Sequence, residues 1–154
     1  MLTANRAYCL HNKRPVMLYP TAPRPSMTFP DDPGSVDGFN SIISIFESIP
    51  LSLYNWLCTP NPNFHDMDAI PHCYWNLSKV SLFPDGALQS QLVNISITQQ
   101  WLRTFLWQVA LKFHPALSTP LPLSAPLEAA KSVMTTITSV SQRSMEVHGI
   151  GMVR

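Results

Sequence analysis

The chain has 154 residues, of which 45% are hydrophobic and only 12% are charged, and its formal net charge is +1. An average globular protein carries about 25% charged residues. The near-neutral charge excludes the basic surface typical of nucleic-acid-binding proteins, and the hydrophobic content argues against intrinsic disorder. Because so few of its side chains are charged, the chain is expected to bury part of its apolar surface against protein other than its own 154 residues.

The three cysteines, Cys9, Cys58 and Cys73, are scattered along the chain and form no paired spacing. A structural zinc site needs four ligands at recurrent spacings, so the sequence predicts no such site. The odd cysteine number, and a beginning without the apolar region of a signal peptide, favour reduced thiols in the nucleus or, alternatively, in the cytoplasm. No apolar run approaches the ~20 residues of a membrane-spanning helix.

The first part of the chain combines an apolar helix with many prolines. Segment 1–35 is predicted to be the end of a helix followed by a proline-rich connector. Residues 36–49 are predicted to form a helix with Asp37 as its N-cap. The apolar stripe of this helix comprises Phe39, Ile42, Ile43 and Phe46.

Helices are predicted to continue through the middle of the chain, over 36–114. Pro50 is expected to interrupt the first of them, after which apolar residues continue to Cys58. Residues 64–80 are predicted to be weakly helical at best, with a helix over 67–76 capped by Asp66 as the alternative. A turn is predicted at Phe83-Pro84-Asp85-Gly86, before the strongest helical pattern of the chain.

That pattern lies in residues 95–114. Ser96 and Gln99 have the spacing of a capping box, which predicts that the helix begins at Ser96, and Pro115 is expected to end it. The predicted buried stripe comprises Ile97, Trp101, Leu102, Phe105, Leu106, Val109 and Phe113. The opposite face is predicted to carry Gln100, Arg103, Thr104, Gln108 and Lys112.

The last part of the chain is predicted to be a second proline-rich connector, 115–126, and a terminal helix, 127–148. Pro126 suits the first turn of this helix, and Gly149 is expected just past its end. Its predicted buried stripe comprises Leu127, Ala130, Met134, Ile137, Val140 and Met145. We therefore predict an all-α fold, an irregular helical array with long proline-rich connectors, in which residues 1–154 form one part of a larger helical domain.

The sequence shows little that indicates chemistry. The most metal-like cluster comprises His65, Asp66, Asp68, His72 and Cys73, but its spacing matches no local ligand geometry, so a loop is the expected structure. The chain has neither a phosphate-binding glycine loop nor a G-x-S-x-G elbow. We therefore predict a protein that is not an enzyme, with no catalytic residue, cofactor or metal.

Three segments carry a more specific signal: RAYCLHNKRP at 6–15, ITQQWLRT-x-x-WQ-x-A at 97–110, and SMEVHGIGM at 144–152. In this order they resemble the regulatory region of fungal zinc-cluster transcription factors, and the central string is the most specific of the three. The residues of this chain that match the family motif, and to which the resemblance gives a structural role, are Gln99, Gln100, Trp101, Leu102, Arg103, Thr104, Trp107, His148 and Gly149.

The resemblance implies a truncated module that takes part in transcriptional regulation in the nucleus. The family's six-cysteine zinc cluster has no counterpart here, so direct DNA binding is not expected. The module would act through a protein partner, either another regulator or its own parent-type domain, or through a small-molecule inducer. Arg103 would either pair with an acidic residue across helices or face solvent.

Two other functions agree with the sequence. In these alternatives to the regulatory module, the chain would be a small accessory or enzyme component of a fungal biosynthetic pathway, or a non-functional gene remnant. A remnant would expose the apolar helical faces that its lost neighbours once covered.

Overall fold

The structure is a computed structural model that describes residues 2–12, 33–57, 67–80, 88–112 and 119–141. Within these ranges it contains six α-helices and no β-strand, so the predicted all-α fold is confirmed. The helices are α1 (Leu2–Asn12), α2 (Pro33–Glu47), α3 (Leu51–Leu57), α4 (Ala69–Lys79), α5 (Gln89–Lys112) and α6 (Ala125–Ser139).

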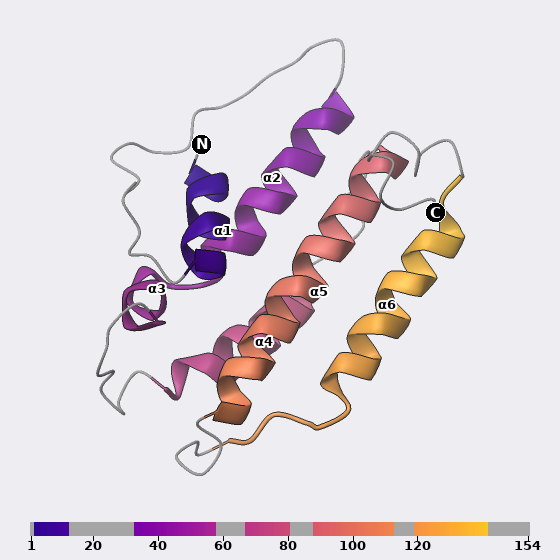
Figure 1. Ribbon diagram of the computed structural model, residues 1–154. Coiled ribbons are helices and arrows are strands. Elements are labelled where there is room, and N and C mark those ends of the chain that lie inside the picture. The colour runs from indigo at the N-terminus through magenta and orange to yellow at the C-terminus, as the bar shows by residue number, and fades with distance from the viewer. Residues whose placement is uncertain (1, 13–32, 58–66, 81–87, 113–118, 142–154) are drawn as a thin grey trace.

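The longest helix, α5, lies at the centre of the molecule. Figure 1 shows α2, α5 and α6 side by side with α5 in the middle, while α4 lies behind α5. α6 runs back along α5 in the opposite direction, and α1 packs against α2 and α3. Because α5 has neighbours on several sides, more than one of its faces is buried.

The core fills the space between α2, α3, α4 and α5. Its almost completely buried side chains include Ile45, Leu53, Tyr54, Ile70, Leu77, Ile95, Leu102 and Leu106. α2 approaches α5 so closely at Gly38 that an added Cβ would overlap the side chain of Gln91. A residue without a side chain is therefore needed at this crossing unless Gln91 moves.

The first three helices agree with the predicted order but not with the predicted cap. Pro50 separates α2 from α3, as expected, and its carbonyl accepts the backbone N–H of Leu53 at 3.0 Å. α2 begins at Pro33, which suits the first position of a helix. Asp37 therefore lies inside α2, and the prediction that it is the N-cap is wrong.

α4 is a regular helix, which is nearer to the alternative prediction of a helix over 67–76 than to a weakly helical segment, although its N-cap residue is Asp68 rather than Asp66. Its buried side chains Ile70, Cys73, Tyr74 and Leu77 follow one another at helical spacing. Pro71 is accommodated because it lies in the first turn, where a backbone N–H is not needed. The apolar spacing therefore outweighs the helix-breaking residues in this segment.

The start of α5 also differs from the prediction. The helix begins at Gln89, nearly two turns before Ser96, so Ser96 and Gln99 do not form a capping box. The Ser96 hydroxyl instead accepts a hydrogen bond from Thr136 Oγ1 at 3.0 Å. The helix ends at Lys112, three residues before Pro115, in agreement with the expected stop.

The buried faces of α5 only partly match the predicted stripe. Leu102 and Leu106 are completely buried, and Phe105 and Val109 pack against the core. Trp101, however, is 38% exposed, whereas Gln100, which was expected on the opposite face, is buried. The predicted places of these two residues are wrong because α4 and α6 cover the polar side of the helix as well.

α6 has the largest departure from its predicted orientation. It begins at Ala125 with Pro126 in its first turn, as expected, but it ends at Ser139 rather than near residue 147. Leu127 and Met134 were predicted to be buried, yet they are 59% and 58% exposed. The residues that face the rest of the protein are Ala125, Ala129 and Thr136.

Candidate functional site

An open groove of about 490 Å³ lies between α1 and α5, beside the end of α2. Sites for small molecules typically have volumes of about 300–1,000 Å³, so the groove has the size of a ligand site. Its lining residues are Ala7, Tyr8, His11 and Asn12 from α1, Phe46 from α2, and Ile97, Thr98 and Trp101 from α5.

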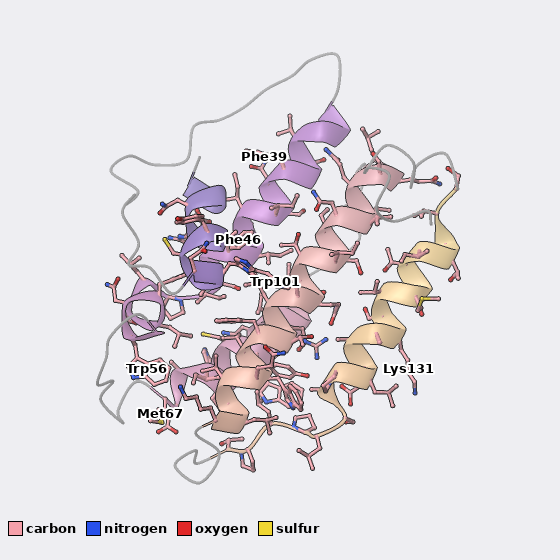
Figure 2. The ribbon with its side chains drawn as sticks, in the orientation of Figure 1. Phe39, Phe46, Trp56, Met67, Trp101 and Lys131 are labelled. Carbon is pink, nitrogen blue, oxygen red and sulfur yellow. The ribbon has the colours of Figure 1, made fainter. Side chains whose placement is uncertain are left out.

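The groove presents two aromatic side chains that solvent reaches. Tyr8 is 59% exposed and Trp101 is 38% exposed. The Trp101 ring stacks on Phe105 with 6.2 Å between ring centroids and 28° between planes, which holds the indole in place. Figure 2 shows Trp101 and Phe46 on the same side of α5, facing α1.

The polar groups in the groove carry no fixed charge. None of the eight lining residues is Lys, Arg, Asp or Glu, whereas His11, Asn12 and Thr98 offer hydrogen-bonding groups. The Asn12 amide nitrogen donates to the backbone carbonyl of Tyr8 at 3.0 Å. The groove therefore suits an uncharged aromatic molecule with one or two polar groups.

The two glutamines of the motif have structural roles. Gln99 Nε2 donates to the carbonyls of Leu77 at 2.6 Å and Val80 at 3.1 Å, at the end of α4. Gln100 Nε2 donates to Gln99 Oε1 at 3.0 Å and to Ser132 Oγ of α6 at 3.3 Å. The pair thus connects α4, α5 and α6, and buried polar groups satisfied in this way specify a single packing arrangement.

Arg103 extends this network toward α4. Its Nη1 donates to Gln100 Oε1 at 3.0 Å, and its Nη2 donates to the Tyr74 hydroxyl at 2.9 Å. The guanidinium also lies 4.7 Å from the centre of the Tyr74 ring, within range of a cation–π interaction. Within the part of the chain that the structure describes, these hydrogen-bond partners are neutral, whereas the sequence suggested an acidic residue or solvent.

The remaining motif residues lie around the same helix. Leu102 is fully buried in the core, Thr104 is half-buried, and Trp107 Nε1 donates to the Pro122 carbonyl at 3.0 Å, which ties the segment before α6 to α5. His148 and Gly149 lie outside the described residues. Of the motif residues that the structure describes, Trp101 is the one that lines the groove.

Arg6 is a buried charged residue that the sequence analysis missed. Its Nη1 donates to the Phe46 carbonyl in the last turn of α2 at 2.9 Å, and its guanidinium lies 5.5 Å from the centre of the Tyr54 ring. The Tyr54 hydroxyl donates to the same carbonyl at 3.2 Å. The negative end of the α2 dipole therefore compensates the buried charge, and Arg6 joins α1 to α2 beneath the groove.

Burial changes the acidity of two groups in the core. Burial raises the pKa of the Tyr54 hydroxyl, and the nearby positive charge of Arg6 opposes this rise without cancelling it. Burial also raises the pKa of the Cys73 thiol from its ordinary value of 9.0 to about 11. Both groups are therefore neutral at pH 7, and the Cys73 thiol is a weak nucleophile there.

The metal-like cluster of the sequence does not assemble among the described residues. Cys73 is buried in the core, whereas His72 and Asp68 are exposed, and His65 and Asp66 lie outside the described ranges. A search of the described residues found no group of three or more His, Cys, Asp or Glu side chains placed to hold a metal ion.

The groove as a whole was not recognised from the sequence. Tyr8 and His11 lie three residues apart, and Ile97 and Trp101 lie four apart, so each pair shares a helix face. This spacing was the only available signal, because no sequence pattern indicates that α1 and α5 approach each other across the end of α2.

None of the helices in the described ranges is long and apolar enough to span a bilayer. Comparisons with protein-family models, curated proteins and solved structures found no match. The likeness to zinc-cluster regulators therefore depends on the quoted segments alone.

Proposed function

We propose that this chain is a non-enzymatic regulatory module of the zinc-cluster transcription factor type, and that it takes an uncharged aromatic effector in the α1–α5 groove. The proposal depends on the positions of the groove residues in the sequence. Four of the eight lining residues lie in segment 6–15 and three in segment 97–110, so seven of the eight belong to segments that resemble the regulators.

The division of roles within the central motif supports the same function. The two glutamines and Arg103 hold α4, α5 and α6 together. Trp101 points away from this network into the groove, where its ring is available for stacking. The motif therefore builds a rigid helical support on one side and a ligand-facing indole on the other, which is the arrangement that a binding site needs.

The effector would act by bridging two helices. A planar molecule between Tyr8 and Trp101 would contact α1 and α5 at once and would stabilise the bound arrangement by mass action. In the regulatory setting, this stabilisation of the α1–α5 arrangement would be passed to a protein partner in the nucleus.

Binding is tested with N-phenyl-1-naphthylamine, an uncharged aromatic dye whose fluorescence rises in apolar surroundings. We expect saturable binding of one dye per chain, weakened at least about tenfold by Trp101→Ala because a stacking surface is lost. Trp75→Ala is the matched control, because Trp75 is 42% exposed and lies on α4 away from the groove. Equal weakening by both variants would contradict a site in the groove.

Regulation is tested by fusing the whole chain to an unrelated DNA-binding domain and measuring transcription from a reporter gene. We expect the fusion to change transcription relative to the DNA-binding domain alone. Trp101→Ala should reduce the change, whereas Trp75→Ala should preserve it. A well-expressed fusion that leaves transcription unchanged would contradict the regulatory function and favour the remnant or the pathway component.

A further inference from the structure

The outer side of α6 and the turn before it carry an uncovered apolar stripe. Leu123 is 77% exposed, Leu127 59% and Met134 58%, and Ala130 is also exposed. Leu127, Ala130 and Met134 follow one another at steps of three and four, so they lie along one side of α6, and Leu123 lies in the turn before the helix. Figure 2 shows Lys131, which flanks this stripe, on the side of α6 that faces away from α5.

The orientation of α6 is set by its inner side. Thr136 Oγ1 donates to Ser96 Oγ at 3.0 Å, and Ser132 Oγ accepts from Gln100 Nε2 at 3.3 Å. Ala125 and Ala129 are buried on the same side, so α6 presents small side chains toward α5 there. Turning the helix to bury Leu127 and Met134 would break both hydrogen bonds, so the apolar stripe stays outside.

We infer that this stripe binds the same stripe of a second copy of the chain, with the two α6 helices antiparallel. In that arrangement Leu127 of each copy faces Ala130 of the other, so a long side chain meets a small one at the centre. Leu123 then faces Met134 at each end. The stripe is thus complementary to itself, as a two-fold symmetric interface requires.

The charges beside the stripe are complementary in the same register. Lys131 of one copy lies within two residues, or about 3 Å along the axis, of the level of Glu128 in the other. Glu128 Oε1 accepts from Ser124 Oγ at 2.7 Å, and the carboxylate has a second oxygen for the lysine. A net charge of +1 also causes little repulsion between copies.

The size of the stripe predicts a weak dimer. A standard interface buries about 800 Å² on each partner, and a single pair of 15-residue helices covers less than that. Sedimentation equilibrium of the whole chain from about 1 to about 500 µM is expected to show a monomer–dimer equilibrium within this range. A wild-type chain that stays monomeric throughout would overturn the inference.

The apolar contact is tested with Leu127→Ser combined with Met134→Ser. This variant should raise the dissociation constant about a hundredfold, because four apolar side chains are lost per dimer. Leu88→Ser is the control, since Leu88 is 46% exposed but precedes α5. Unchanged helix content by circular dichroism would show that both variants fold, and equal loss of the dimer in both would overturn the inference.

The contact between Lys131 and Glu128 distinguishes the antiparallel dimer from a non-specific apolar association of chains. Lys131→Glu should weaken self-association, because it places two acidic residues opposite each other. Mixing Lys131→Glu chains with Glu128→Lys chains should form heterodimers more tightly than either variant forms homodimers. A mixture that shows no such preference would overturn the antiparallel register.

Discussion

The contacts of α5 with α4 and with α6 both contain hydrogen bonds, but they differ in the size of the side chains that are buried beside them. Toward α4 the contact is mostly apolar, with Leu77 and Leu102 completely buried and Gln99 bound to the end of the helix. Toward α6 the contact consists of small and hydroxyl-bearing residues, among them Ala129 and Thr136. Large buried apolar side chains together with hydrogen bonds therefore place α4, whereas small side chains and hydrogen bonds to hydroxyl groups set how α6 is turned.

The largest expected effect contrasts a core leucine with a leucine of α6. Leu102→Ala removes a completely buried side chain and is expected to lower the free energy of unfolding by about 3 kcal/mol. Leu127→Ala, at an exposed position, is expected to change it by less than about 0.5 kcal/mol. Urea unfolding at a concentration where the chain is monomeric measures both. Similar losses in the two variants would show that α6 contributes to the core like α4.

The next effect concerns the polar part of the α4 contact. Gln99→Met keeps the side-chain volume but removes the donor to the carbonyls of Leu77 and Val80, and is expected to cost about 2 kcal/mol. Gln108→Met, on the exposed side of α5, is the control and is expected to cost little. If urea unfolding gives the same small value for both, the end of α4 does not need this donor.

A smaller effect is expected at the α6 contact. Thr136→Val removes one buried hydroxyl while keeping the shape, and is expected to cost about 1 kcal/mol because the Ser96 hydroxyl loses its partner. Thr138→Val, exposed on the same helix, is the control. Thermal unfolding followed by circular dichroism compares the two. A stabilised Thr136→Val variant would mean that apolar packing, rather than this hydrogen bond, orients α6.

The smallest expected effect is that of mildly alkaline pH on the free energy of unfolding, through Cys73 in the buried face of α4. The folded state holds the Cys73 pKa at about 11, above its ordinary value of 9.0, so the unfolded chain loses this proton first. The stability contributed by the neutral Cys73 thiol is therefore fully present well below pH 9 and is lost as the pH rises through 9 toward 11. A fall of about 0.4 kcal/mol is expected between pH 7 and pH 9.

Urea unfolding at pH 7 and pH 9 measures this slope, and Cys73→Ala should flatten it. The buried Tyr54 hydroxyl, whose pKa is also raised, adds a decline of the same sign at higher pH. A chain that becomes more stable between pH 7 and pH 9 would show that Cys73 is not held neutral in the folded state.

Several local features could be predicted because their causes are local. Pro50 breaks the chain between α2 and α3, and Pro126 lies in the first turn of α6, since a proline ring constrains its own backbone wherever it occurs. α5 was predicted as a helix but with the wrong start. Ser96 and Gln99 have capping-box spacing, yet they use their side chains for contacts with other helices.

The groove and the orientation of α6 could not be predicted in the same way. Trp101 was assigned to the core because large aromatic residues at helical spacing are usually buried. Its exposure depends on the position of α1, which lies more than eighty residues earlier in the chain. Likewise, the apolar residues of α6 were predicted to face the core. The sequence does not show that Ser96 and Gln100 form hydrogen bonds with hydroxyl groups of α6, and these bonds turn the apolar residues outward.

By itself, the sequence determined that the chain is helical, where prolines separate its helices, and that its central string resembles a regulatory motif. The first two properties follow from backbone constraints and from apolar residues repeated over three and four positions, which act within one segment, and the third follows from the residue string itself. Only the tertiary structure decided that Trp101 faces a groove, that Gln99 and Gln100 are buried, and that α6 turns its apolar side outward. Each of these depends on which side of a helix its neighbours cover, and that is a property of contacts between segments distant in the sequence.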